Sequence, residues 1–134
     1  MSKSESSKVH PLQLHLLETS YISFISGGEK RAALTNQLIG VYAGLFTTLP
    51  GGSFIGASVQ ESREKISLYE GTANSVSIAS GRISYVLGLT GPCFPVDSAC
   101  SAALVAAHLA SSGLQRNECE QACVVAGGIL EPGI

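Results

Sequence analysis

The sequence predicts a layered α/β fold, and three observations lead to that prediction. Apolar residues recur at helical spacing in three segments, which begin at Pro11, near Val76 and at Ser101. Short apolar or β-forming runs, typical of strands, cover residues 38–46, 93–96 and 121–128. Helical segments and strands alternate along the chain, which is the order expected of helices layered on a sheet.

The chain has few charges with which to cover its own surface. Its 134 residues are 45 % hydrophobic and 13 % charged, whereas a typical soluble domain is about 25 % charged. The length allows one domain at most. We therefore expect the surface to meet a partner or to belong to a larger fold. The net charge of −2 argues against nucleic-acid binding.

Residues 1–9 are expected to form a disordered N-terminal segment, and residues 10–134 are expected to form the folded domain. No apolar core of a signal peptide follows the polar first eight residues. No apolar run reaches the roughly 18 residues that a membrane span needs. These observations predict a cytoplasmic protein without a membrane span.

Proline suits the first turn of a helix, so the first helix is expected to start at Pro11, with Leu12 and Leu16 near one face. His10 and His15 are expected to be surface or hydrogen-bonded histidines.

Residues 27–31 predict a solvated turn, and residues 38–46 a buried strand. Gly51 and Gly52 indicate a phosphate loop only weakly, because no Lys-Ser or Lys-Thr follows them. Residues 62–69 fit a short helix or a loop.

The helix over residues 76–87 is expected to end at Gly88, because glycine adopts the left-handed cap at little cost. Arg82 is expected to have a structural ion-pair role. Small residues along this helix would let another element approach closely: Ser77, Ser80, Gly81 and Ser84.

The four cysteines, Cys93, Cys100, Cys119 and Cys123, predict neither a disulfide framework nor a zinc site. Disulfides are rare without a secretory signal. Only Cys119 and Cys123 approach the spacing of metal ligands, and Cys123 opens an apolar run. Both are expected to pack in the core, with no metal bound.

Cys100 lies where a short strand gives way to a helix. The unpaired first amides of a helix and the positive end of its dipole stabilise a thiolate, which is the nucleophilic form. Small neighbours leave the sulfur open to a substrate. Spacing alone also allows a buried cysteine that acts as a small hydrophobe.

The following helix is expected to span residues 101–112, to stop at Gly113 and to be buried, since it is apolar on nearly every face. His108 lies roughly 12 Å along this helix from Cys100. A base needs roughly 2.6–3.2 Å or one bridging water, so His108 is expected to pack instead. Asp97 is expected to cap or orient the turn.

Two motifs resemble those of the β-ketoacyl synthases, the condensing enzymes of fatty acid and polyketide synthesis. Residues 96–101 (Val-Asp-Ser-Ala-Cys-Ser) resemble the family's active-site signature. Residues 81–85 (Gly-Arg-Ile-Ser-Tyr) resemble the segment before the active-site strand. Residues 10–18 are similar to a family helix, with departures at its polar and basic positions. The similarity is strongest to ketosynthase domains of type I or modular polyketide synthases.

The resemblance implies a thiolase-like (ketosynthase) fold, of which residues 10–134 would form the first part of the N-terminal half only. It also implies that Cys100 is the catalytic residue. In the family, this cysteine accepts an acyl group from the phosphopantetheine arm of an acyl carrier protein. Decarboxylative Claisen condensation with malonyl carrier protein follows. The resemblance implies no directly bound cofactor.

Two family histidines assist condensation, in His-Gly-Thr-Gly-Thr and Asn-Ile-Gly-His motifs. The sequence contains neither motif, so the isolated chain is expected to be incomplete for catalysis. Ketosynthases are dimers, which implies a second copy or the remainder of a larger synthase as a partner.

Two other interpretations remain open. The chain could be a non-catalytic thiolase-fold remnant that acts as a dimerisation or scaffold piece, as its low charge and small-residue helices allow. A chalcone or acetoacetyl synthase type fits less well, because residues 81–85 favour the ketosynthase branch. A serine hydrolase is set aside, since the sequence has no Gly-x-Ser-x-Gly motif.

Overall fold

The computed structural model describes residues 9–47 and 75–129. The alternating helices and strands predicted from the sequence are confirmed, and with them the α/β class. The predictions for residues 1–8, for Gly51 and Gly52 and for residues 62–69 lie outside the described residues. In chain order, the elements are α2 (Pro11–Ser26), α3 (Arg31–Leu34), β1 (Ile39–Thr47), a 3-10 turn (Val76–Ile78), α5 (Ala79–Leu87), β2 (Cys93–Val96), a second 3-10 turn (Ala99–Ser101), α6 (Ala102–Gln115) and β3 (Gln121–Ile129).

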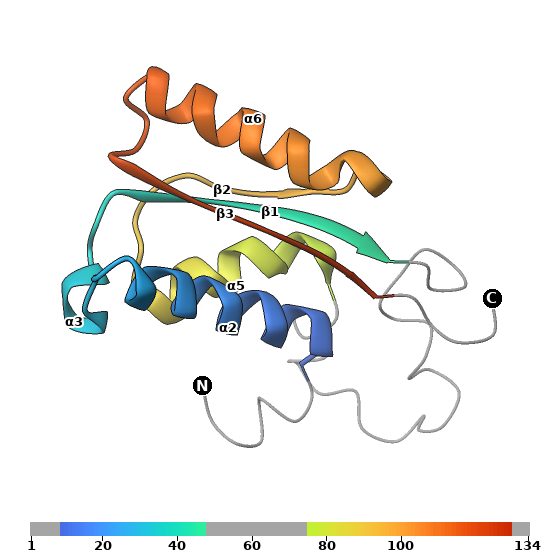
Figure 1. Ribbon diagram of the computed structural model, residues 1–134, viewed down its shortest axis with the longest axis horizontal. Helices are drawn as coiled ribbons and strands as arrows, with labels where there is room; N and C mark the ends of the chain where they lie inside the picture. The colour runs from blue at the N-terminus through green and yellow to red at the C-terminus, as the bar shows by residue number, and fades with distance from the viewer. Residues whose placement is uncertain (1–8, 48–74, 130–134) are drawn as a thin grey trace.

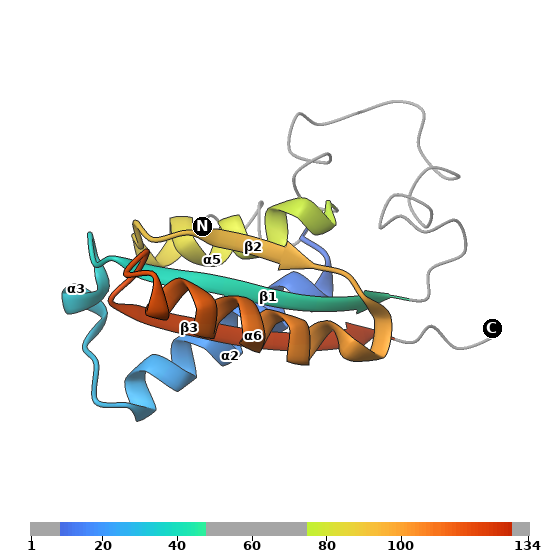
Figure 2. The same ribbon diagram turned by 90° about the horizontal axis from the view of Figure 1, so that it is seen from above.

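The strands of the described part form a parallel sheet in the order β2-β1-β3. The central strand β1 pairs with β3 from Ile39 to Thr47 and with β2 from Val41 to Gly44. Helix α6 covers one face of the sheet, and α2 and α5 cover the other (Figure 1). Viewed from above, α6 runs along the strands, mainly over β1 and β3 (Figure 2). The chain therefore forms three layers.

The order of the strands explains which helix lies on which face. The chain passes from β1 to β2 through α5, then crosses back over β1 to β3 through α6. Connections between parallel strands are right-handed in about 98 % of cases. Two connections of one hand that run in opposite directions along a sheet lie on opposite faces. The placement of α5 and α6 satisfies this rule.

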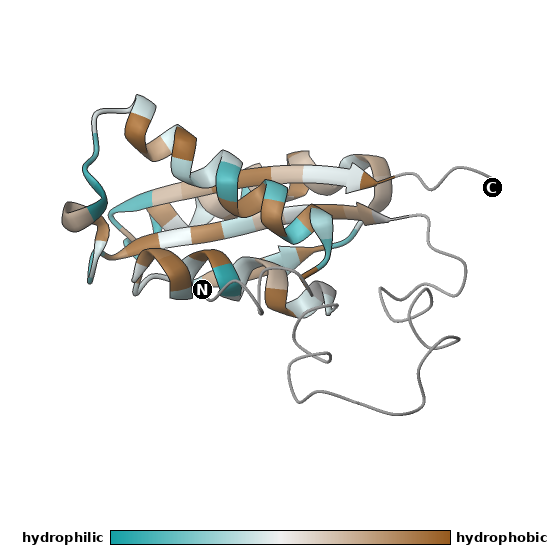
Figure 3. Ribbon diagram, turned by 90° about the horizontal axis from the view of Figure 1, so that it is seen from below, coloured by the Kyte–Doolittle hydropathy of each residue, from teal (hydrophilic) through white to brown (hydrophobic). Residues whose placement is uncertain are grey.

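Strand β1 is buried on both faces, and its side chains alternate between two cores. Tyr42 faces α6 and packs against Ala106 and Ala110. The alternate residues belong to the larger core under α2 and α5. Figure 3, seen from that side, shows apolar residues along the strands. The β1 residues in this larger core are Ile39, Val41, Ala43 and Leu45.

Helix α6 differs from its prediction in length and in burial. It continues through Gly113 to Gln115, so the expected stop at Gly113 is wrong. Glycine is needed there for another reason, because a Cβ at Gly113 would collide with the hydroxyl of Tyr42. The buried residues of α6 lie along one face of the helix: Ala102, Ala106, Ala110 and Gly113.

The opposite face of α6 is exposed, so the prediction of a fully buried helix is wrong. No described element covers this face, which leaves Leu104 75 % exposed. His108 is exposed as well, and the prediction that it packs is also wrong. Other large apolar residues exposed on α6 are Val105, Leu109 and Leu114.

Helix α5 ends as predicted, with Gly88 in the left-handed conformation (φ 72°, ψ 30°). Arg82 is buried, and its Nε donates a 2.9 Å hydrogen bond to Oε1 of Gln13, which joins α5 to α2. This hydrogen bond gives Arg82 a structural contact, whereas the ion pair expected for it stays a prediction. Nothing described lies within 4 Å of a Cβ placed at Gly81, so that side of α5 is open to approach.

The first helix begins at Pro11 as predicted, and it continues to Ser26. Nδ1 of His10 accepts a 3.2 Å hydrogen bond from the amide of Leu12, and His15 is exposed. These positions agree with the structural interpretation of both histidines. In the described part of the chain, no helix combines the length and the apolar character needed to cross a bilayer.

Candidate active site

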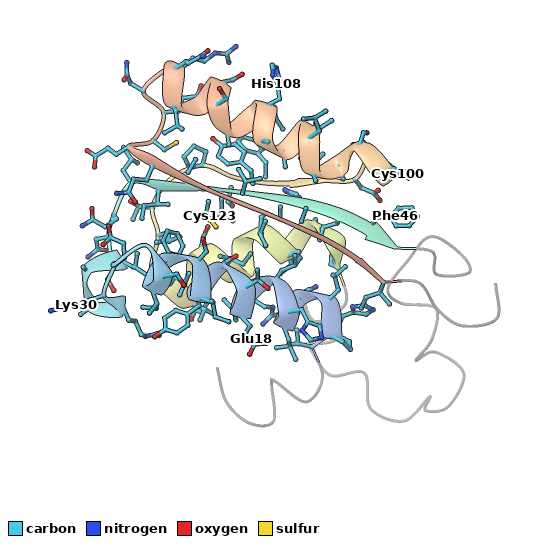
Figure 4. The ribbon with its side chains drawn as sticks, in the orientation of Figure 1. Glu18, Lys30, Phe46, Cys100, His108 and Cys123 are labelled. Carbon is cyan, nitrogen blue, oxygen red and sulfur yellow. The ribbon has the colours of Figure 1, made fainter. Side chains whose placement is uncertain are left out.

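The carboxyl ends of the parallel strands lie at one end of the sheet (Figure 1), and Cys100 lies beside them (Figure 4). Strand β2 ends at Val96, and the 3-10 turn of Ala99–Ser101 leads directly into α6. This confirms the expected strand, turn and helix around Cys100. In open α/β sheets, ligands bind beyond the carboxyl ends of the strands. The position of Cys100 therefore suits a group that meets a substrate.

The backbone before Cys100 is strained. Ala99 has a positive φ of 52°, in the left-handed region that residues other than glycine rarely adopt. This conformation costs roughly 1–2 kcal/mol in an L-residue. Such outliers cluster at active sites, where the surrounding structure holds them in place. The strain marks this turn as a candidate functional feature on geometric grounds, independent of its residue types.

A serine pair holds the turn closed. The Ser101 hydroxyl donates a 2.7 Å hydrogen bond to the carbonyl oxygen of Ser98 and lies 3.0 Å from the Ser98 hydroxyl. The amide of Ser101 donates to the same carbonyl at 3.2 Å. Asp97 was expected to cap this turn, but the N-cap residue is Ser98, and Asp97 is exposed. The expected capping role of Asp97 is therefore wrong, whereas its alternative role in orienting the turn stays a prediction.

Cys100 is exposed at the rim of a depression of about 270 Å³. Figure 4 shows Cys100 and Phe46 at the same end of the molecule, from the start of α6 and the end of β1. Small residues make up most of the lining, so the sulfur is accessible. The lining residues are Gly44, Phe46, Ala99, Cys100, Ala102, Ala103, Ala126, Gly127 and Gly128.

The amino-terminal end of α6 rests directly on β1. A Cβ placed at Gly44 would lie 2.7 Å from the carbonyl carbon and oxygen of Ala102 and 2.9 Å from the amide nitrogen of Ala103. Real Cβ atoms do not approach backbone atoms this closely, so Gly44 lets the helix start near the strand. The contact fixes the height of Cys100 above the sheet.

The side chains near Cys100 can present a thiol but do not bring a base to it. Figure 4 shows His108 farther along α6 from Cys100, on the side away from the sheet. This agrees with the prediction that His108 cannot serve as the base. The start of α6 supplies the positive end of the helix dipole. The site therefore provides an accessible sulfur near the positive end of a helix.

The remaining cysteines occupy different environments. Cys93 is exposed on β2, whereas Cys119 and Cys123 are buried, as predicted for packing residues. Cys119 lies against Gly40 on the α6 side, and Cys123 belongs to the core under α2 and α5. Burial raises the pKa of the Cys123 thiol, which the hydroxyl of Ser20 partly offsets. Within residues 9–47 and 75–129, no group of three His, Cys, Asp or Glu side chains could hold a metal ion.

Tyr42 lies deep beneath α6. Its ring stacks on that of Phe94, with centroids 5.8 Å apart and planes inclined by 25°. Its hydroxyl has no hydrogen-bond partner among the described residues. Burial raises the pKa of this hydroxyl, and the nearby Cys119 and Glu118 add to the shift. Tyr42 is a packing residue that supports α6 from below.

Cys100 was predictable from the sequence, but the residues that surround it were not. Phe46, Gly44 and Gly128 come from strands distant in sequence, and only the strand register brings them to the same end as Cys100. The available signal was the position of each at or near the end of an expected strand. The Ser98–Ser101 hydrogen bond was missed because serines near a helix start have several possible partners.

A family model and curated relatives both match the chain to β-ketoacyl synthases or polyketide synthases. The family model described as "Beta-ketoacyl synthase, N-terminal domain" matches residues 1–132. The chain is 40 % identical over 129 residues to the pikromycin polyketide synthase component PikAII of Streptomyces venezuelae. This match covers 96 % of the chain and 3 % of that protein. It is 38 % identical over 131 residues to the phenolphthiocerol synthesis polyketide synthase Pks15/1 of Mycobacterium marinum, covering 98 % and 6 % respectively.

Solved structures give the same result. The ketosynthase from module 6 of the bacillaene synthase of Bacillus subtilis superposes with a TM-score of 0.75 at 30 % identity, covering 98 % of this chain and 21 % of that one. The oxazolomycin ketosynthase domain OzmH KS8 of Streptomyces albus gives 0.70 at 26 % identity, covering 94 % and 27 %. The chain thus spans 21 % and 27 % of these two ketosynthase chains, and 3 % and 6 % of the two curated relatives.

Proposed function

Since the chain belongs to the β-ketoacyl synthase family and matches its N-terminal domain, we propose that Cys100 is the acyl-accepting nucleophile of a polyketide-type condensing enzyme. The observation that carries this proposal is the position of Cys100. Its thiol is exposed at a strained turn, at the start of α6 and beside the carboxyl ends of the strands. The thiolase-like fold seen in the ketosynthase neighbours supports the proposal.

In the first step, the Cys100 thiolate attacks the carbonyl carbon of an acyl thioester. A bond forms between the carbonyl carbon and Sγ, and the bond to the sulfur of the phosphopantetheine arm breaks. The arm leaves as a thiolate and takes up a proton from water. The depression lined by small residues gives an acyl group room beside the sulfur. This step is the part of the reaction that the described residues can support.

The oxyanion that forms during this attack needs a hydrogen-bond donor. The amide of Ser101 is already bonded to the carbonyl of Ser98. We therefore assign the donor role to the amide of Cys100, at the start of the helix. The positive end of the helix dipole adds to the stabilisation of negative charge there.

In the second step, malonyl carrier protein loses carbon dioxide. The resulting carbanion attacks the acyl carbon, and Cys100 leaves as a thiolate. The product is longer by two carbons. The family resemblance assigns this step two histidines, in His-Gly-Thr-Gly-Thr and Asn-Ile-Gly-His motifs that the 134-residue sequence does not contain. The proposal is that condensation requires residues beyond those of this sequence.

The partners of this reaction are an acyl carrier protein, with acyl and malonyl thioesters on its phosphopantetheine arm. The relatives named above are polyketide synthases, which supports a polyketide rather than a fatty acid setting. A second copy or the remainder of a synthase would also be a partner, because the outer face of α6 exposes apolar residues.

To test the proposal, the chain is incubated with one carrier protein loaded with an acyl group and another loaded with malonyl. The products are then analysed by mass spectrometry. The expected result is an acyl group on Cys100 with no extended product. Extension by this chain alone would contradict the assigned need for the histidines. Absence of acyl-Cys100 from folded protein would contradict the assigned nucleophile.

A second candidate function is that of a non-catalytic scaffold or dimerisation piece. The exposed apolar face of α6, with Leu104 at 75 % exposure, favours it. The open side of α5 at Gly81 offers a second surface for close approach. An inert Cys100 in a chain that still forms a stable complex through the Gly81 side of α5 would support this function over condensation.

A further inference from the structure

The depression at Cys100 has one large side chain in its lining, that of Phe46. The other lining residues are glycines, alanines and Cys100 itself, whose side chains are short. Phe46 is half-buried, as expected of a ring with one side against the depression. The room beside the sulfur therefore depends mainly on this ring.

Phe46 and Cys100 both lie beyond the contact between β1 and α6. Side chains alternate along a strand, so Phe46 faces α6, as Gly44 and Tyr42 do. At about 3.3 Å per residue, Phe46 lies roughly 7 Å beyond Gly44 toward the carboxyl end of β1. The chain enters α6 from this end, so Cys100 lies beyond Ala102 in the same direction (Figure 4). The ring and the thiol are thus neighbours in space from distant parts of the chain.

Phe46 belongs to neither of the two hydrophobic cores of the described residues. Its ring lies instead beside Gly128, which is its register partner on β3. A Cβ placed at Gly128 would lie 3.2 Å from Cδ1 of Phe46 and 3.0 Å from its carbonyl oxygen. The missing side chain of Gly128 therefore lets the ring lie close to β3. Because the ring packs in no core, replacing it leaves no cavity in either one.

We propose that Phe46 limits the size of the acyl group that Cys100 can carry. This inference rests on the proposed function, because it concerns the same thiol and the same acyl transfer. Apart from the thiol, the lining side chains are apolar, so an acyl chain is more stable in the depression than in water. A short chain fits beside the ring, whereas a longer one meets the ring. The substrate class is therefore short, apolar acyl thioesters.

Phe46 would act as a specificity-determining residue. It contacts the acyl chain and takes no part in the bonds that form and break at Sγ of Cys100. A mismatch of one methylene in an apolar pocket changes discrimination between substrates by roughly 10- to 200-fold. The expected signature is therefore a change in the preference between chain lengths.

The test compares acetyl and hexanoyl thioesters of N-acetylcysteamine on the full chain. All proteins carry Cys93→Ala, which leaves Cys100 as the exposed cysteine. Timed intact-mass spectra give the hexanoyl-to-acetyl ratio of acylation rates, which does not depend on the fraction of folded protein. The ratio should rise by about tenfold or more in Phe46→Ala and should fall in Phe46→Trp.

Phe94→Ala is the matched control, because it removes the same side chain from the neighbouring strand β2 and Phe94 does not line the depression. It should leave the ratio unchanged. A ratio that stays at the value of the parent protein in both Phe46 variants would overturn the proposal. An equal rise in Phe94→Ala would overturn it as well.

A second measurement separates this inference from the proposed function. Iodoacetamide and a bulkier N-substituted iodoacetamide alkylate a thiol without thioester chemistry. If thioesters leave Cys100 of the folded chain unmodified, the proposed function fails. A higher ratio of bulky to small alkylation in Phe46→Ala would still support the limit set by Phe46, whereas an unchanged ratio would overturn it.

Discussion

The hydroxyl of Ser101 donates a 2.7 Å hydrogen bond to the carbonyl oxygen of Ser98, across the turn that carries Cys100. This bond joins the two residues on either side of the strained Ala99 and the thiol. It compensates for part of the strain, because it gives the carbonyl of Ser98, which also accepts from the Ser101 amide, a second donor. The position of Cys100 thus depends on a side chain one residue away.

Replacement of Ser101 by alanine is expected to loosen this turn. The lost hydrogen bond should lower the free energy of unfolding by about 1 kcal/mol. The rate of Cys100 acylation should fall by roughly fivefold, if the same energy is lost in the transition state. Both are measurable, by chemical denaturation and by timed mass spectra. Ser111→Ala, at an exposed position on α6, should leave the acylation rate unchanged and should not lower the free energy of unfolding, because alanine is the better helix former.

Gly44→Ala should both lower the free energy of unfolding and displace Cys100. The new Cβ would lie 2.7 Å from backbone atoms of Ala102, which cannot move without the start of α6. Overpacking of this kind costs about 1–3 kcal/mol. Denaturant unfolding and the acylation rate should both show the effect.

Gly81→Ala provides the matched control for Gly44→Ala. Nothing described lies within 4 Å of its Cβ, and Gly81 is inside helix α5. Alanine is favoured over glycine in helices by about 1 kcal/mol, so this variant should be neutral or more stable. Equal destabilisation by both substitutions would contradict the assigned contact between Gly44 and α6.

Ala99→Gly should have little effect or increase stability. Glycine adopts a positive φ without strain, which stabilises the folded state. This gain offsets the destabilisation caused by the greater conformational entropy of glycine in the unfolded chain. The same change at Ala107, an exposed position inside α6, should lower the free energy of unfolding by about 1 kcal/mol. A thermal or denaturant melt of the two variants makes the comparison. Similar losses at both positions would show that Ala99 is not strained.

The free energy of unfolding should fall as the pH rises above the ordinary pKa of a cysteine thiol. Burial raises the pKa of Cys123 in the folded state, so the unfolded thiol loses its proton first, near about pH 8.5. Below that pH both states keep the proton, and the full stability is present. Above it, the loss is at most about 1.4 kcal/mol per pH unit for this group.

Cys123→Ala should reduce this slope above about pH 8.5 in denaturant titrations. Tyr42, whose pKa burial also raises, should account for a further loss at higher pH. An unchanged slope in Cys123→Ala would contradict the assignment to Cys123.

Local patterns predicted most of the elements of this fold. The apolar run of β1 and the left-handed Gly88 were recognisable because each depends on nearby residues. Burial of α6 was not, because an apolar helix predicts that a covering partner exists, and the described residues include none on its outer side. Gly113 was taken for a helix stop, whereas it makes room for Tyr42, more than 60 residues earlier in the chain.

The candidate site was predictable only in part. Cys100 and its turn follow from a strand and helix adjacent in sequence. The strain at Ala99, the Ser98–Ser101 bond and the floor formed by Gly44 depend on backbone angles and strand register, which residue types alone do not determine.

Intact-mass analysis after incubation with a short acyl thioester shows whether Cys100 is the nucleophile. Cys93→Ala and Cys100→Ala are the paired variants, since these two cysteines are exposed and the other two are buried. We expect one acyl adduct on the wild type and on Cys93→Ala, and none on Cys100→Ala. An adduct that persists in Cys100→Ala, or none on folded wild-type protein, would contradict it.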